Sequence, residues 1–368
     1  MVTEKISNPY LILLVLLGFV VLRCIYKPAL SINKELSAVH KYLGVFMIIV
    51  ICLFSVQDTD YFHYKTALIA MSRGAILHFE DVYYSIGEMV SYNYLLFRLV
   101  VWGSAFTFFC WSVKRLNVTL QVALFFFVAM YLTKFCYARA SLAMSMGLLG
   151  YTFLVKPARF KWISYFLGIV IIVTSLQFHK SAIFMIPMYI LSFFKLNKFT
   201  IGVSLFLFPL GYYFISEYGI ALLMGADDGD AIANSAQGYL MHDTVNKGIA
   251  VIIQRVLERV PYYIILYIII SSIMNKTYAL LPSYQRSILN LVIYIIAFSS
   301  LFLFNYTVNT EVMYYRFLYY SILPLSIVLP ILLRTAEHPK MLKLAYTMGF
   351  YATVYTVLYS FYNAYLSA

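Results

Sequence analysis

The stretch SLQFHKSAIF, residues 175–184, joins two apolar runs at about 162–178 and 182–194. Each run is near the length that a helix needs to cross a bilayer, although the second is short. His179 and Lys180 lie side by side between them. Crossing a membrane does not require such polar side chains, so the pair needs another explanation. The pattern predicts two membrane helices joined by a polar connection whose His179 and Lys180 are candidate functional residues.

The same alternation of apolar runs and polar connections extends along the whole chain. Of its 368 residues, 63% are hydrophobic and 11% are charged, whereas soluble domains are near half apolar and a quarter charged. No soluble core could absorb this excess, so we predict an all-α polytopic membrane protein forming a single transmembrane domain over 1–368. Its twelve predicted spans lie at about 9–23, 42–57, 94–113, 118–135, 138–155, 162–178, 182–194, 199–216, 261–274, 287–305, 317–333 and 343–362.

Charge predicts how these spans are oriented. The connections on one face hold 16 of the 27 Lys and Arg residues but only two of the 15 Asp and Glu residues. Cytoplasmic loops are enriched in Lys and Arg, so this face is predicted to be cytoplasmic and both termini extracytoplasmic. The net charge of +12 has the same explanation and does not indicate nucleic-acid binding. Two long outer segments, about 58–93 and 217–260, are expected to cover an active site on the outer face.

Basic residues nevertheless recur at the outer helix ends, where the orientation rule disfavours them. An arginine in the hydrocarbon costs about 2.5–3.5 kcal/mol on insertion scales, so a group of them calls for an anionic partner. Arg139 opens a helix rich in small residues, YARASLAMSMGLLG (137–150), which permits close helix approach and a rigidly held arginine. The group comprises Arg98, Lys134, Arg139, Lys180, Arg255, Arg259 and Arg316.

Two of these arginines form a pair with two interpretations. Arg255 and Arg259 lie four residues apart and share one face of a helical stretch, which either lies on the membrane surface or extends the 261–274 span. Guanidinium groups match phosphate oxygens, so the pair can clamp a phosphate. Equally, it can flank Glu258 on a solvated face.

Candidate bases lie at two of the outer connections. His179 can act as a general base near neutral pH. Lys180 adds positive charge, but adjacent helical residues face different ways, so the two need a bend or serve different groups. Asp58 and Asp60 follow the second span, where a carboxylate can act as a base or bind a metal, or belong to a solvated loop. The sequence shows no metal-ligand spacing, and we predict neither a metal nor a cofactor.

The late stretch EVMYYRFLYY, residues 311–320, combines charge with aromatic rings. Glu311 and Arg316 stand where an outer connection meets the 317–333 span, among Tyr315, Tyr319 and other tyrosines. Tyrosines suit a membrane interface, and they also stack on sugar faces. The stretch is a candidate sugar-binding site.

Three stretches, taken in order, resemble the EpsG-like group of bacterial polysaccharide polymerases, which are Wzy-type enzymes. They are RASLA at 139–143, FHKSA at 178–182 and YRFLYY at 315–320, with DY at 60–61 and Tyr64 as a similar early feature. The resemblance spans about residues 40–335. Ala140 stands where the family often has Gln, and Glu88-Met89 stands in place of a Glu-Pro pair.

The resemblance implies an enzyme of the bacterial cytoplasmic membrane that joins oligosaccharide repeat units carried on undecaprenyl pyrophosphate, for O-antigen, capsule or exopolysaccharide. It also implies a helical fold like that of O-antigen ligases and GT-C glycosyltransferases, with a chain-length regulator protein and a flippase as further partners. An inverting single displacement would use His179 or Asp60 as base, with Arg139 and Arg316 stabilising the leaving pyrophosphate. The expected substrate-binding residues are Lys180, Arg255, Arg259, Asp58, Tyr61, Tyr315, Tyr319 and Glu311.

Three other functions remain open at this point. A GT-C transferase using a polyprenyl monophosphate sugar would carry an acidic motif on the first outer segment, which Asp58-Thr59-Asp60 fits. A flippase or transporter for the same lipid would tend to show broken helices and inverted repeats, which the sequence does not show. An O-acyltransferase would use its reactive histidine on the cytoplasmic side.

Overall fold

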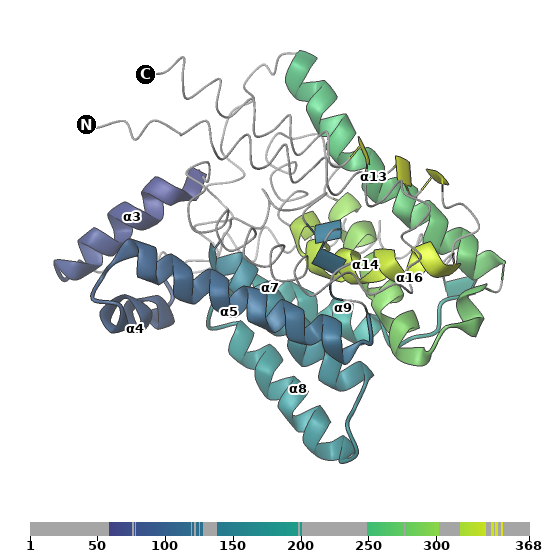
Figure 1. The fold of residues 1–368 in the computed structure, drawn as a ribbon, viewed down its shortest axis with the longest axis horizontal. Helices are drawn as coiled ribbons and strands as arrows, with labels where there is room; N and C mark the ends of the chain where they lie inside the picture. The colour runs from purple at the N-terminus through teal and green to yellow at the C-terminus, as the bar shows by residue number, and fades with distance from the viewer. Residues whose placement is uncertain are drawn as a thin grey trace, which may run out of the picture.

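The computed structural model of the 368-residue chain describes residues 59–127, 138–200, 249–301 and 317–348, except for positions 76, 78, 119, 121, 122, 125, 198, 276, 336–339, 342, 345 and 346. The regular elements in this part of the chain are helices, and no strand occurs in it (Figure 1). The predicted all-helical fold class is therefore confirmed for these residues.

Helix α7 (Ala138–Val155) is the centre of the described structure. It packs against α5 (Tyr94–Arg115) and α8 (Lys161–Ser175), and it also contacts α14 (Ser283–Leu301) and α16 (Ile322–Thr335). Figure 1 shows α8 projecting away from the other described helices, so that much of its surface has no neighbour among them. The position of α7 is thus fixed on several sides, and so is the position of a residue at either of its ends.

The backbones of α7 and α8 touch at Gly150 and Gly168. A Cβ atom on Gly150 would lie 2.7 Å from the carbonyl oxygen of Gly168, and one on Gly168 would lie 2.8 Å from the carbonyl oxygen of Gly150. Such distances are too short for a real Cβ atom, so glycine is required at both positions for this approach. The close approach expected from the small residues of 137–150 is present.

Helices α5 and α7 run in the same direction, which their C-terminal ends make clear. Arg115 donates from Nε to Thr152 Oγ1 at 3.1 Å and from Nη2 to the carbonyl oxygen of Lys156 at 2.9 Å. Lys156 Nζ donates to the carbonyl oxygen of Arg115 at 2.7 Å. These contacts bring the C-terminal ends of α5 and α7 together, so the two helices are parallel.

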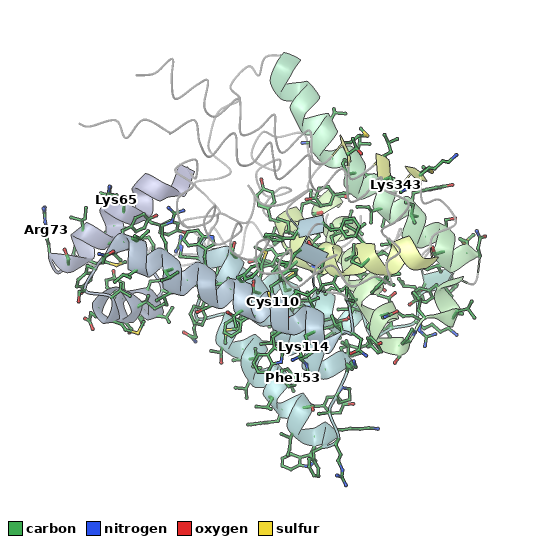
Figure 2. All side chains as sticks on the ribbon, viewed as in Figure 1. Lys65, Arg73, Cys110, Lys114, Phe153 and Lys343 are labelled. Atoms are coloured by element: carbon green, nitrogen blue, oxygen red, sulfur yellow. The ribbon has the colours of Figure 1, made fainter. Side chains whose placement is uncertain are left out.

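Figure 2 shows the two ends of this arrangement. Lys114 and Phe153 lie at the C-terminal ends of α5 and α7, far from Lys65 of α3 (Thr59–Ser72). The 18 residues of α7 span about 27 Å at a rise of 1.5 Å per residue. The basic residues at the C-terminal end of α7 are therefore separated from Arg139 by nearly the thickness of a bilayer core.

The segment 58–93, which we predicted to lie on the outer face, contains two helices in its described part. Helix α3 contacts α4 (Asp81–Met89), and α4 leads directly into α5. The connection between α3 and α4 is closed by Tyr84, whose hydroxyl accepts from the amide of Leu77 and donates to its carbonyl oxygen. These two hydrogen bonds fix the position of Leu77 against α4.

The stretch 175–184 interrupts the helices on either side of it. After α8 ends at Ser175, His179 adopts an extended backbone with φ −163° and ψ 113°. The short 3-10 helix η2 (Lys180–Phe184) follows and leads into α9 (Met185–Leu191). One of the two arrangements expected for His179 and Lys180, a bend between the helices, is present.

The C-terminal half of the described chain supplies longer helices. Helix α13 (Ile249–Met274) is one helix of 26 residues that runs through Pro261, so residues 249–260 extend the predicted 261–274 span. Among the described helices, Tyr94–Arg115 is long and apolar enough by itself to cross a membrane. Shorter apolar helices cover Arg139–Val155, Lys161–Ser175, Ala182–Leu191, Arg259–Met274 and Ile322–Leu332.

The contact between α7 and α8 gives a first prediction. Gly150→Ala and Gly168→Ala each place a Cβ against a backbone oxygen, so each should lower the stability of the purified protein by about 1–3 kcal/mol. Gly103→Ala in α5 is the matched control, because a Cβ there meets no heavy atom within 4 Å. Thermal unfolding in detergent measures the effect, and equal melting temperatures for Gly150→Ala and Gly103→Ala would contradict the backbone contact.

Candidate functional site

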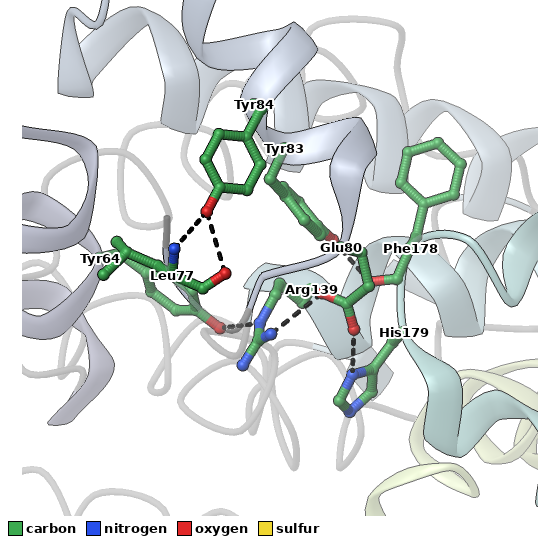
Figure 3. Close-up of polar contacts among 8 residues, drawn as sticks. All are labelled: Tyr64, Leu77, Glu80, Tyr83, Tyr84, Arg139, Phe178 and His179. Carbon is green, nitrogen blue, oxygen red and sulfur yellow. Dashed lines mark hydrogen bonds and ion pairs between the residues drawn. The ribbon is translucent and has the colours of Figure 1, made fainter. Parts of the chain in front are cut away.

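Four polar side chains from different parts of the chain meet around one carboxylate, and we call them the Glu80 cluster: Tyr64, Glu80, Arg139 and His179 (Figure 3). Arg139 Nη1 donates to Glu80 Oε2 at 3.0 Å, and Arg139 Nε donates to the hydroxyl of Tyr64 at 2.9 Å. The other carboxylate oxygen, Glu80 Oε1, lies 3.6 Å from His179 Nδ1. Arg139 and His179, which the sequence analysis singled out separately, thus share a partner.

Glu80 is available to this cluster because it does not cap its own helix. It occupies the N-cap position of α4 with an extended backbone, φ −64° and ψ 139°, but its side chain makes no capping hydrogen bond. Ser, Thr, Asp and Asn are the residues that ordinarily cap a helix through the side chain, and the longer Glu80 does not act in this way. Its carboxylate instead reaches Arg139 and His179, and its side chain is only 11% exposed.

Arg139 is held by rings as well as by the carboxylate. Its guanidinium carbon lies 4.6 Å from the ring centre of Phe79 and 5.6 Å from that of Tyr64. Aromatic faces attract a cation, and the attraction grows when the cation is withdrawn from water. The arginine therefore has a fixed orientation in which Nε and Nη1 are engaged, while Nη2 is the guanidinium nitrogen that neither Tyr64 nor Glu80 occupies.

The connection that carries His179 is tied to α4 by Tyr83. The hydroxyl of this fully buried tyrosine donates to the carbonyl oxygen of Phe178 at 2.9 Å. The rings of Tyr83 and Phe178 also meet edge to face, with centroids 6.4 Å apart. Burial raises the pKa of Tyr83 well above its ordinary value, so its hydroxyl keeps the proton that it donates. Helix α4 thereby sets the positions of both Glu80 and His179.

The charges in the Glu80 cluster are strongly coupled. Burial alone would raise the pKa of the Glu80 carboxyl, but contact with His179 and the charge of Arg139 together lower it to about 2. Glu80 is therefore ionised throughout the physiological range and offsets the charge of Arg139. We expected the arginines at the outer helix ends to need an anionic partner, and for Arg139 one such partner belongs to the chain itself.

The remaining predicted site residues are not part of the Glu80 cluster in the described structure. Lys180 is exposed at the start of η2, next to His179. Arg259 is partly buried in α13, and Tyr319 is partly buried just before α16. Asp60 and Tyr61 belong to the first turn of α3 and Arg255 to α13, but their side chains lie outside the described part, as do Asp58, Glu311, Tyr315 and Arg316 altogether.

Glu80 and Tyr83 were not found by sequence reasoning, which singled out Asp58 and Asp60 as the acids of the same segment. Glu88 is exposed at the far end of α4 and takes no part in the cluster. The available signal was the need of Arg139 for a counter-charge, because the 58–93 segment offers several acids for it.

Within the described residues no group of three His, Cys, Asp or Glu side chains could hold a metal ion.

Acidification tests the pairing of Glu80. Its pKa of about 2 in the folded protein lies below the ordinary value of 4.5, so its stabilising contribution is present above pH 4.5 and is lost as the pH falls toward 2. We expect wild type to lose about 3 kcal/mol more than Glu80→Gln over this interval, measured by unfolding in detergent. Glu88→Gln should keep the wild-type decline. Parallel curves for wild type and Glu80→Gln would show that the carboxylate is not paired.

Comparison with known proteins bears on the identity of this site. The model of the EpsG family matches residues 37–367, a range that includes every member of the Glu80 cluster. Neither the curated proteins nor the solved structures contain a match to the chain. EpsG-like proteins are Wzy-type polysaccharide polymerases. Since the family match covers nearly the whole chain, the protein belongs to the EpsG family.

Proposed function

We propose that this polysaccharide polymerase is a multi-pass membrane glycosyltransferase that joins repeat units carried on undecaprenyl pyrophosphate, at the outer face of the cytoplasmic membrane. Family membership supports the polymerase activity in general. The observation that carries the more specific proposal is the meeting of Arg139 and His179 on one carboxylate. A cation and an imidazole held together in this way suit the two needs of the reaction, a stabilised leaving group and a base.

The exposed surface supports a position in the membrane. Large apolar side chains of α8 are exposed along its length, where a soluble protein would carry polar ones. Twelve spans with both termini outside, in a GT-C-like arrangement, remain our proposal for the whole chain. The exposed apolar residues of α8 are Trp162, Ile163, Tyr165, Phe166, Leu167, Ile169, Val170 and Val173.

The two ends of α7 support the choice of face. Arg115 and Lys156 lie at one end, in the set of basic residues predicted to be cytoplasmic. Arg139 lies at the other end, about 27 Å away along 18 helical residues. A lipid-borne pyrophosphate would present its charge at that level, the boundary between hydrocarbon and water.

In the proposed reaction an acceptor hydroxyl attacks the anomeric carbon of the donor glycan. The carbon–oxygen bond to the pyrophosphate breaks, its electron pair leaves with that group, and the hydroxyl proton passes to His179 or Asp60. Attack from the opposite side inverts the anomeric carbon. Arg139 can offer Nη2 to the leaving group, and stabilisation of developing charge is commonly the largest catalytic contribution.

Because Glu80 offsets the charge of Arg139, further cations are needed to hold a pyrophosphate. We propose that Arg316 stabilises the leaving pyrophosphate together with Arg139, and that Lys180, Arg255 and Arg259 bind the substrate. Asp58, Tyr61, Glu311, Tyr315 and Tyr319 are proposed to contact the sugars. No metal is required in this scheme, because guanidinium groups supply the positive charge.

Reconstituted protein supplied with lipid-linked repeat units tests the proposal. Wild type should lengthen the glycans, and Arg139→Ala should do so at least about 100-fold more slowly, since a group that stabilises the leaving charge is lost. Arg159→Ala, which removes an exposed arginine from the opposite end, is the matched control.

Two results would favour other functions. If lipid-linked repeats cross the bilayer without growing longer, the protein is a transporter. If Asp58→Ala/Asp60→Ala abolishes transfer while Arg139→Ala retains it, and a polyprenyl monophosphate sugar serves as donor, the enzyme is a transferase of the monophosphate type.

A further inference from the structure

The two oxygens of Glu80 have different partners, and this division carries a further inference. Oε2 receives the hydrogen bond from Arg139 Nη1 at 3.0 Å, whereas Oε1 faces His179 Nδ1 at 3.6 Å. A carboxylate that served only to neutralise an arginine would gain most from accepting both of its hydrogen bonds from the guanidinium. Here one oxygen remains directed at the imidazole.

The imidazole presents its two nitrogens to different surroundings. Nδ1 is buried and has no hydrogen-bond partner among the described residues, so Glu80 Oε1 is the polar atom that it faces. Since the side chain as a whole is 22% exposed, that exposure belongs to the rest of the ring. Figure 3 shows the second ring nitrogen, Nε2, on the side of the ring away from Glu80.

Arg139 opens toward the same side. In Figure 3 its third guanidinium nitrogen, the one bound neither to Tyr64 nor to Glu80, points away from the carboxylate in the direction in which His179 Nε2 also points. A reacting group placed there would meet a cationic donor and an imidazole nitrogen together. Glu80 thus lies on one side of the cluster, and Arg139 Nη2 and His179 Nε2 both point away from it.

We propose that Glu80 is a positioning residue that holds His179 with its proton on Nδ1, so that Nε2 is the atom that accepts the proton of the acceptor hydroxyl. This inference rests on the proposed polymerase function and assigns the base to His179 rather than to Asp60. Arg139 contributes by keeping Glu80 in place through Nη1, in addition to any contact with the leaving group.

The chemistry follows from the properties of a carboxylate. An ionised carboxylate can only accept hydrogen bonds, so the nitrogen that faces it must carry the proton, and in neutral imidazole the other nitrogen then has the free electron pair. The acceptor oxygen bonds to the anomeric carbon as its proton moves to Nε2, and the bond from that carbon to the pyrophosphate oxygen breaks with both electrons leaving on the pyrophosphate. The imidazolium that forms is stabilised by the adjacent Glu80.

Glu80 also has a structural role as the partner of Arg139, and the test must separate the two. A purely structural loss would lower the amount of folded protein and leave the turnover of each folded molecule unchanged. A positioning role lowers kcat with little change in KM and depends on the presence of His179. If Glu80 and His179 act as one unit, the loss of kcat in the double variant is smaller than the product of the two single losses.

The experiment measures steady-state elongation of lipid-linked repeat units by reconstituted wild type, Glu80→Gln, Glu80→Asp, His179→Gln and the double variant Glu80→Gln/His179→Gln. Glu80→Gln should reduce kcat by about 100-fold with KM changed less than about threefold, because the amide fails to select the tautomer. Glu80→Asp should recover part of the rate. The double variant should be no slower than His179→Gln. Glu88→Gln is the control and should match wild type.

The contrary outcomes are distinct. Multiplied losses in the double variant, or equal kcat for Glu80→Gln and Glu88→Gln, would overturn the positioning role and leave the polymerase function intact. If wild type fails to lengthen the glycans, the proposed function fails and the role of Glu80 fails with it. If Glu80→Gln does not yield folded protein, Glu80→Asp and Glu80→Asp/His179→Gln replace it, with the same expectation of no additional loss beyond His179→Gln.

Discussion

The pairing of Arg139 with Glu80 is the interaction on which the rest of the described site depends. An arginine at the end of an apolar helix is costly unless an opposite charge accompanies it, and removing one partner of a buried pair leaves the other uncompensated. The carboxylate comes from the segment before α5, and the arginine opens the central helix α7. The pair therefore connects this segment to the core of the helix bundle, and it fixes the carboxylate against which His179 lies.

This arrangement explains how polar groups are held at the N-terminal end of the central helix α7. Tyr83 ties α4 to the connection before η2, and Tyr64 ties α3 to Arg139, so that three separate segments converge at the start of α7. The contact of Gly150 with Gly168 holds α8 against α7 and so limits where the connection after α8 can run. Packing in the apolar part and hydrogen bonding in the polar part thus determine the same geometry.

Sequence reasoning found the parts of this structure that depend on local pattern. The predicted spans 94–113 and 138–155 agree closely with α5 and α7, and the break at 175–184 follows from a polar pair between apolar runs. Arg139 and His179 stood out because polar groups are rare at such positions. Glu80 did not stand out, because its role arises from contacts with residues 59 and 99 positions away, and no local pattern records a pairing of that range. Helices α3 and α4 were also missed, since neither gives a membrane-span signal in the sequence.

The most direct measurement is the structure of the protein in a lipid nanodisc with a pyrophosphate-linked repeat unit bound. The account predicts that the pyrophosphate lies beside Arg139 Nη2, on the side of Glu80 to which His179 Nε2 is presented, with Glu80 still between the arginine and the imidazole. A pyrophosphate bound at the opposite end of α7, beside Arg115 and Lys156, would contradict it.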